Sequence, residues 1–232
     1  SPEGRKLNDN DLTILDKWIL SKMHKLIKDA TENYNAFRVD KFMRSFERFL
    51  DDLSNWYIRR NRRRFWKAED DADKLTAYQT LYEVLFTTIR LLAPCLPFVS
   101  EEIYQNLVRS SIGDAPESIH LCDFPIADEA SIDETLMNQV DALRKVVEQS
   151  RSARNKANLK IRQPLAKLCF AVEDDDVAAF IEANSKVILD ELNVKTLVRV
   201  MDISELIQYE VKPNLPFLGE HYGKQMKEIR TA

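Results

Sequence analysis

The sequence predicts a mainly α-helical protein in which a helical bundle is followed by a small α+β domain. Glycine is rare, with 4 residues in a chain of 232, so few positions can adopt a positive φ cheaply. Apolar residues in the first half recur at the helical period of about 3.6 residues, and the alternation typical of a strand occurs only in the second half. Helices should therefore account for most of the chain.

Four amphipathic helices with short connections are expected in the first half, which is the pattern of a helical bundle. They cover, in chain order, residues 11–31, 39–57, 74–93 and a short stretch that starts at Pro97. Asn10 or Asp11 would cap the first helix, and Pro94 and Pro97 would end the third. The side chains expected to face inward are Leu81, Tyr82, Leu85, Phe86, Ile89 and Leu92 on the third helix, and Ile103, Tyr104 and Leu107 on the fourth.

The second half follows a segment, residues 113–133, that is rich in Ser, Gly, Pro and Asp and is expected to be a linker. Residues 1–112 would then form the bundle domain and residues 134–232 the α+β domain. The expected elements of the latter are a long helix ending near Ala157, a strand at 165–172, a helix at 177–189, a strand at 194–200, a short strand near 206–211, an irregular segment at 212–219 and a short closing helix.

Composition argues against several classes of site. The cysteines, Cys95, Cys122 and Cys169, are far apart and form no CxxC or Cys/His spacing, so no metal site is expected. Reduced thiols fit the cytoplasm. No run of about 18 apolar residues occurs, so membrane insertion is not expected. The histidines have no nucleophilic partner at a recognisable spacing, and no Gly-rich phosphate loop is present, so no catalytic residue is assigned.

The strongest functional signal is the basic–aromatic segment, Asn55–Lys67. It contains six Lys or Arg residues, four aromatic rings and no acidic residue, in a chain whose net charge is −4. Such a composition offers phosphate contacts and stacking platforms, which RNA recognition combines. If the helix continues from Leu53, Arg60 and Arg64 turn toward the protein. The outward-facing candidates for RNA contact are Arg59, Arg62, Arg63 and Trp66.

Two alternatives stay open at this level. The arginines of the basic–aromatic segment are equally suited to ion pairs and cation–π contacts within the bundle. A second basic stretch, from Arg151 to Arg162, offers Arg154, Lys156 and Arg162 as further candidates for RNA contact. The helix dipole alone also favours cations near a helix C-terminus, which is the competing explanation for this stretch.

Several segments resemble the anticodon-binding helical domain of class I aminoacyl-tRNA synthetases for Ile, Val and Leu. They are residues 55–66 (NWYIRRNRRRFW), similar to the signature of that domain, residues 15–20 (LDKWIL), similar to its first helix, and residues 92–104 (LAPCLPFVSEEIY), similar to a later helix junction. The three occur in the order of the family. Residues 154–165 and 191–195 resemble the C-terminal region of isoleucyl-tRNA synthetases.

The resemblance implies a role within a larger enzyme that ligates isoleucine to tRNA using ATP and Mg. Its catalytic HIGH and KMSKS motifs are absent here, although residues 21–25 (SKMHK) imitate the second within the first helix. The catalytic and editing domains would lie upstream, and this chain would be inactive alone and hold no cofactor. Its implied partner is tRNA for Ile, bound at the anticodon stem-loop. The alternatives are the corresponding part of a valyl- or leucyl-tRNA synthetase, and a helical interaction scaffold without an RNA role.

Overall fold

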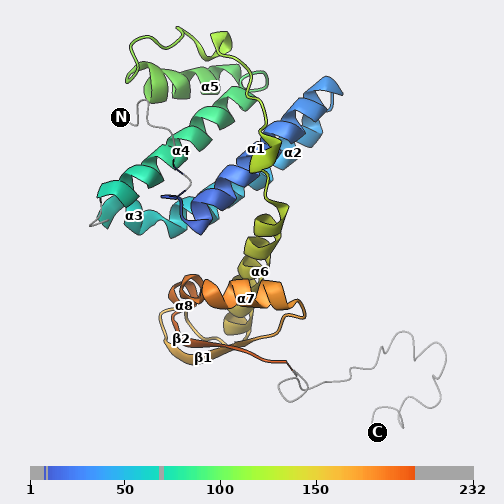
Figure 1. Cartoon of the computed structure of the whole chain (residues 1–232), viewed down its shortest axis with the longest axis vertical. Coiled ribbons are helices and arrows are strands. Elements are labelled where there is room, and N and C mark those ends of the chain that lie inside the picture. The colour runs from blue at the N-terminus through green and yellow to red at the C-terminus, as the bar shows by residue number, and fades with distance from the viewer. Residues whose placement is uncertain (1–7, 9, 68–70, 202–232) are drawn as a thin grey trace, which may run out of the picture. The chain divides into compact units, whose positions relative to one another are not determined.

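The chain is built mainly from helices, with one two-stranded sheet in its second half. Figure 1 shows the computed structural model, which describes residue 8 and residues 10–67 and 71–201. This architecture confirms the predicted fold class, mainly α with a small α+β part. None of the helices within these ranges is long and apolar enough to cross a membrane.

Two compact units divide the chain, Ser1–Arg144 and Lys145–Ala232, and the division falls inside helix α6 (Glu134–Lys156). Residues 113–133, which the sequence suggested as a linker, belong to the first unit. Their Ile119 is buried in a small apolar core there, which ties the segment down. The compact units therefore differ from the predicted domains, and the domain boundaries stay a prediction.

The first unit is a helical bundle that begins at a capping box. The Oγ of Thr13 accepts from the Asp16 N–H at 3.3 Å, and the Asp16 carboxylate accepts from the Thr13 N–H at 2.9 Å. The predicted cap at Asn10 or Asp11 is therefore wrong. The elements, in chain order, are α1 (Ile14–Asn35), α2 (Val39–Asp51), the π-helix η1 (Asp52–Ile58), α3 (Arg62–Lys67), α4 (Asp71–Leu92), α5 (Pro97–Tyr104), the π-helix η2 (Gln105–Arg109) and the 3₁₀-helices η3 (Ile119–Leu121) and η4 (Glu129–Ser131).

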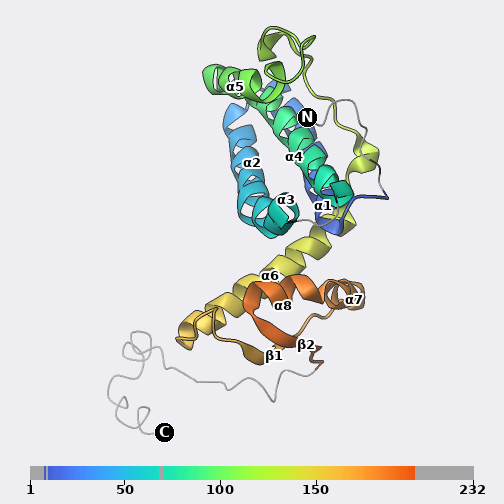
Figure 2. The ribbon, with the colours of Figure 1, turned by 90° about the vertical axis from the view of Figure 1, so that its left-hand side faces the viewer.

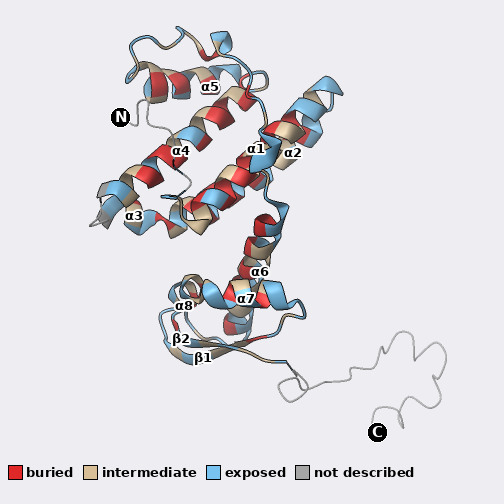
Figure 3. Cartoon of the chain, viewed as in Figure 1, coloured by how far each residue is buried: buried red, intermediate tan, exposed pale blue. Residues whose placement is uncertain are grey.

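Helix α1 is central to the bundle because it packs against both α2 and α4 (Figures 1 and 2). Buried residues recur along α1 and α4, as Figure 3 shows. Full burial of one large apolar side chain contributes roughly 2 kcal/mol to stability relative to leaving it exposed. The largest fully buried side chains of this core include Trp18, Ile19, Ile27, Phe42, Leu53, Tyr57, Val84 and Leu91.

The inward face of α4 matches the prediction at Ile89 and Leu92, which are buried, and differs from it elsewhere. Leu81, Tyr82, Leu85 and Phe86 are only half-buried, whereas Ala77, Thr80, Val84 and Leu91 are completely buried. The fully buried positions of α4 thus hold mostly small side chains, and the larger apolar residues lie at partly exposed positions. On α5 the prediction was right for Tyr104, which is completely buried, and wrong for Ile103, which is 39% exposed.

The second unit contains a parallel strand pair joined by helices. Strand β1 (Leu165–Phe170) pairs with β2 (Val194–Arg199), and Leu165 lies opposite Val194. Parallel strands need a crossover connection, which α7 (Asp175–Ala183) and α8 (Ser185–Leu192) provide. The sequence predicted one helix where these two meet at Asn184. The strand expected near 206–211, the irregular segment at 212–219 and the closing helix lie outside the described residues.

Candidate nucleic-acid interface

The basic–aromatic segment does not continue α2 as one regular helix. It runs through the π-helix η1, a turn at Asn61 and the separate helix α3. The carbonyl of the buried Asn61 accepts from the Arg64 N–H at 2.9 Å and the Phe65 N–H at 3.2 Å, which starts α3. Because a π-helix has a wider turn than an α-helix, a single α-helical phase could not be assumed across this stretch.

Aromatic rings anchor one side of the segment in the bundle. Trp56, Tyr57 and Phe65 are 6%, 0% and 8% exposed. The Phe65 ring meets the Tyr78 ring of α4 edge-on, with 5.3 Å between their centroids. The Tyr57 hydroxyl donates to Oδ1 of Asp16 at 2.6 Å. Burial and the charge of Asp16 both raise the pKa of Tyr57. These anchors lie before and after the turn, so they fix which side of α3 faces the protein.

Arg64 is held inside the bundle by two carboxylates. Its Nη1 lies 2.9 Å from both oxygens of Asp16, and its Nε lies 2.9 Å from Oδ1 of Asp73. Burial alone would lower the pKa of Arg64, but the hydrogen bonds and charges of Asp73 and Asp16 outweigh it and raise that pKa. This confirms the prediction that Arg64 turns toward the protein, and the ion pairs show how its charge is accommodated there. The capping pattern Thr13-x-x-Asp16 is the one sequence signal that could have pointed to its first partner.

The opposite side of the segment presents cations and a ring to solvent. Arg59, Arg62 and Arg63 are exposed, and Trp66 is 78% exposed. Arg60 is half-buried. The outward orientation predicted for Arg59, Arg62, Arg63 and Trp66 is therefore confirmed. The prediction holds despite the turn because the buried ring of Phe65 fixes which side of α3 faces the bundle. Exposed guanidinium groups beside an exposed indole can contact phosphates and stack on a base.

In a separate ion cluster of the first unit, the cations Lys22 and Arg144 pair with a carboxylate of the protein itself. Asp52 accepts from Lys22 at 3.3 Å and also from Arg144. The Arg144 guanidinium lies 5.7 Å from the centre of the Trp18 ring and 5.5 Å from that of Trp56. Ion pairs and cation–π contacts within the bundle are the alternative to RNA contact that the sequence left open for basic residues. Arg144 fits that alternative, whereas Arg62 and Arg63 of α3 form no ion pair or cation–π contact with the residues that the structure describes.

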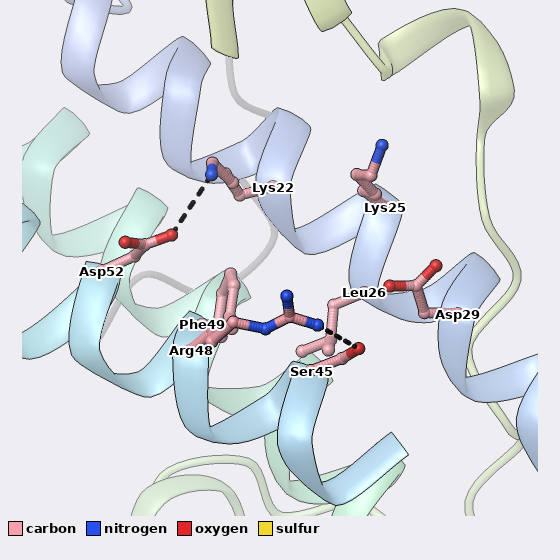
Figure 4. A pocket seen from close by; sticks show the side chains of 8 residues that line it. All are labelled: Lys22, Lys25, Leu26, Asp29, Ser45, Arg48, Phe49 and Asp52. Carbon is pink, nitrogen blue, oxygen red and sulfur yellow. Dashed lines mark hydrogen bonds and ion pairs between the residues drawn. The ribbon is translucent and has the colours of Figure 1, made fainter. Parts of the chain in front are cut away.

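A cavity of about 190 Å³ lies between α1 and α2 (Figure 4). Its charges largely cancel, because Lys22 pairs with Asp52 and Lys25 pairs with Glu134 at 2.5 Å. Its volume is below the range of about 300–1,000 Å³ that is usual for small-molecule sites, so it does not indicate one. The residues that line it are Lys22, Lys25, Leu26, Asp29, Ser45, Arg48, Phe49 and Asp52.

The second basic stretch is divided by the structure. Arg154 is 4% exposed, and its guanidinium donates to the carbonyls of Lys160, Gln163 and Leu192 at 3.0, 3.1 and 2.7 Å. A guanidinium that is buried and committed to carbonyls cannot reach a phosphate, so the prediction of RNA contact is wrong for Arg154. Its role is to join the loop after α6 to the end of α8. Lys156 and Arg162 are exposed and stay candidates.

The described residues hold no group of three or more His, Cys, Asp or Glu side chains that could bind a metal ion. Nδ1 of His24 accepts from the Asp128 N–H at 3.2 Å. Burial lowers the pKa of His24, although the negative charge of Asp128 acts in the opposite direction. Residues 21–25, which imitate KMSKS, lie within α1, where Met23 is 2% exposed. The exposed side of the basic–aromatic segment, by contrast, is suited to binding through charge and stacking.

Comparison with known proteins agrees with this chemistry. The isoleucine–tRNA ligases of Clostridium tetani and Thermus thermophilus are 44% and 45% identical to this chain over 217 and 224 residues, and each alignment covers 94% of the chain. That of Dehalococcoides mccartyi is 49% identical over 184 residues, or 79% of the chain. The chain spans only 20%, 21% and 18% of the lengths of these relatives.

A family match covers both the bundle and the basic–aromatic segment. The family described as the anticodon-binding domain of tRNA ligase matches residues 16–169. The matched range contains the buried pair of Arg64 with Asp16 as well as the exposed side chains of α3. The chain therefore belongs to the family of anticodon-binding domains of tRNA ligases.

Proposed function

We propose that this chain is the part of an isoleucine–tRNA ligase that binds the anticodon stem-loop of tRNA for Ile. The observation that carries the proposal is the two-sided build of α3. Arg64 is fixed by Asp16 and Asp73, while Arg62, Arg63 and Trp66 are exposed on the other side. Side chains presented from a rigid helix bind with less loss of conformational entropy than side chains on a loop.

Each exposed residue has a distinct role in this proposal. Arg59, Arg62 and Arg63 contact phosphates, which gives affinity and orientation without reading sequence. The Trp66 ring offers a flat surface on which an unpaired base stacks. Lys156 and Arg162, in the second unit, are proposed as additional phosphate contacts. Arg60 and Arg64 are assigned to the bundle.

The contribution of this domain to the whole enzyme is placement of the substrate. Holding the anticodon stem-loop orients the tRNA so that its acceptor end can reach a distant active site. The whole ligase is proposed to join isoleucine to tRNA with ATP and Mg in the cytoplasm, where the three free cysteines stay reduced. The catalytic and editing domains would be other parts of the parent chain.

The sequence identity of 44% and 45% to isoleucine–tRNA ligases, over 94% of the chain, favours tRNA for Ile as the ligand over tRNA for Val or Leu. A titration of the 232-residue chain with each of these three tRNAs tests this. Tightest binding of tRNA for Ile would support the assignment. Tighter binding of tRNA for Val or Leu would reassign the parent enzyme, and no binding of any tRNA at low salt would favour a helical scaffold without an RNA role.

Salt dependence and charge reversal test the interface itself. With the five proposed phosphate contacts, log K should fall with log salt with a slope of roughly −3.5 to −4.5. Reversing Arg62 and Arg63 to Glu should weaken binding by more than about tenfold and make the slope shallower. The matched control is Lys186→Glu with Lys195→Glu, which changes the net charge equally at two exposed positions of the second unit. Equal loss in both double variants would show that only overall charge matters.

A further inference from the structure

Phe37 lies in the turn between α1 and α2 in a backbone conformation that rarely holds a bulky residue. Its φ is +54°, in the left-handed region. The Phe37 N–H bonds to the Tyr34 carbonyl at 3.0 Å and the Arg38 N–H to the Asn33 carbonyl at 2.8 Å. These two bonds define a Schellman motif, in which glycine is the favoured residue at the position of Phe37. The turn would therefore form more easily without this ring.

The Phe37 side chain does not stabilise the fold through packing. Phe37 is 93% exposed, so its burial stabilises neither helix. The two other non-glycine residues with positive φ among the described residues are Asn158 and Asn193, and asparagine tolerates this region well. Asn193 also uses its side chain, which donates to the Arg162 carbonyl at 2.9 Å. A strained and exposed aromatic residue points to a function outside the fold.

Cations outnumber acids among the exposed residues around Phe37, with four Lys or Arg against Glu32, Asp40 and Glu47 over residues 31–48. Arg38 follows it directly, and Lys41, Arg44 and Arg48 are exposed on α2. At about 100° per residue these three lie within about 60° of one another, so they form one row along the helix. The carboxylate of Asp40 lies 3.8 Å from Arg44, but both groups are highly exposed, and an exposed pair of this kind neutralises little. Among the described residues no carboxylate pairs with Arg48.

Charge decides which kind of partner fits this ring. Phe98 on α5 is almost as exposed, at 88%, but residues 91–108 contain no Lys or Arg. An exposed ring without cations resembles a protein contact, whereas a ring beside a row of cations suits a base and its phosphates. The turn lies at the end of the α1–α2 pair that points away from α3 (Figure 1), so it is separate from the interface already described.

We propose that Phe37 is a stacking platform for an unpaired nucleotide of the bound RNA, with Lys41 and Arg44 contacting its phosphates. This inference rests on the proposed tRNA binding and adds a second contact to it. Neither Phe37 nor the cations of α2 stood out in the sequence, because a single Phe before a helix has the appearance of a core residue. Only its φ and its exposure distinguish it.

The turn favours glycine at position 37, whereas the proposed stacking requires the Phe ring, and this difference can be tested. In Phe37→Gly the turn receives its favoured residue, so the thermal midpoint should not fall, while binding of tRNA for Ile by the 232-residue chain should weaken roughly tenfold. Phe37→Tyr keeps a ring and should bind like the wild type. Phe98→Ala removes an equally exposed ring that lacks cationic neighbours and should leave binding unchanged.

The outcomes separate this inference from the function on which it rests. If the wild type fails to bind tRNA at low salt, the proposed function is lost. If the wild type binds and Phe37→Gly binds equally well, the stacking platform is wrong and the ring belongs to a protein contact. If Phe37→Gly loses binding and its thermal midpoint falls as well, the ring has a structural role, which also overturns the inference.

Discussion

One terminal nitrogen of Arg64 lies 2.9 Å from both carboxylate oxygens of Asp16, at the point where α3 meets the start of α1. Asp16 is fully buried, and the Arg64 side chain is 14% exposed. The same carboxylate caps α1 through Thr13 and accepts from the Tyr57 hydroxyl. One acidic side chain thus fixes the beginning of the bundle and the direction of the helix that carries the candidate RNA contacts.

Replacing Arg64 by Met should therefore destabilise the chain strongly. Asp16 would remain buried without its cation, and breaking a buried pair in this way costs about 3 kcal/mol. Urea unfolding of the variant measures the loss. The double variant Asp16→Asn with Arg64→Met should recover part of it, because no uncompensated charge remains. Arg62→Met is the exposed control, and a cost for Arg64→Met no larger than for this control would contradict the assigned role.

Helical phase predicted the side of Arg64 correctly because large buried rings flank it. Trp56, Tyr57 and Phe65 set the orientation locally, and their hydrophobicity is visible in the sequence. The partners Asp16 and Asp73 could not be predicted with the same ease, since they come from two other helices. Local periodicity determines which side of a helix is buried, but not which residue lies opposite.

The same reasoning failed on α4 for a physical reason. Hydrophobicity favours Leu81 and Leu85 as inward residues, yet both are only half-buried, and the smaller Ala77 and Val84 are fully buried instead. The distance between two helices depends on the size of the side chains at their contact, and a single helix does not reveal the neighbour that it will approach. Arg154 is a similar case, because one of the carbonyls that hold it, that of Leu192, lies 38 residues further along the chain.

Arg154 should prove structural when it is substituted. In Arg154→Met the carbonyls of Lys160, Gln163 and Leu192 lose their buried donor, which should cost about 3 kcal/mol. Hydrogen exchange should detect the loss in β1 and β2, while the amides of α1 keep their protection. Lys156→Met is the control on the exposed side of α6, where the change should stay within about 0.5 kcal/mol. Weaker RNA binding by Arg154→Met without loss of protection would contradict this role.

The attachment of residues 113–121 to α5 should weaken in acid. The Glu101 carboxylate accepts from Gln105 Nε2 at 2.7 Å, Ser118 Oγ at 2.8 Å and the Ile119 N–H at 3.0 Å. The bond from Gln105 lowers the pKa of Glu101 most, and those from Ser118 and Ile119 add to it, although desolvation opposes them. A folded pKa below the usual 4.5 means that this contribution is present above that value and is lost as the pH falls through the folded pKa.

Thermal midpoints between about pH 3 and pH 6 would measure this effect. Glu101→Gln should show a shallower fall toward low pH than the wild type, because the titrating carboxylate is gone. Glu102→Gln, at the next and exposed position, should keep the slope of the wild type. Parallel curves for the wild type and Glu101→Gln would show that the carboxylate does not hold the segment.

Phe65 and Trp66 are adjacent aromatic residues on α3 that should respond in opposite ways to substitution. Phe65 is 8% exposed and packs on Tyr78, so Phe65→Ala should cost about 3 kcal/mol of unfolding free energy. Trp66 is 78% exposed, so Trp66→Ala should change that free energy by less than about 0.5 kcal/mol. Stacking of a base on Trp66 is worth roughly 1–3 kcal/mol, so the same variant should bind tRNA for Ile at least about fivefold more weakly. Unfolding and tRNA titrations on both variants separate the two roles, and a Trp66→Ala variant that binds like the wild type would move the stacking contact away from α3.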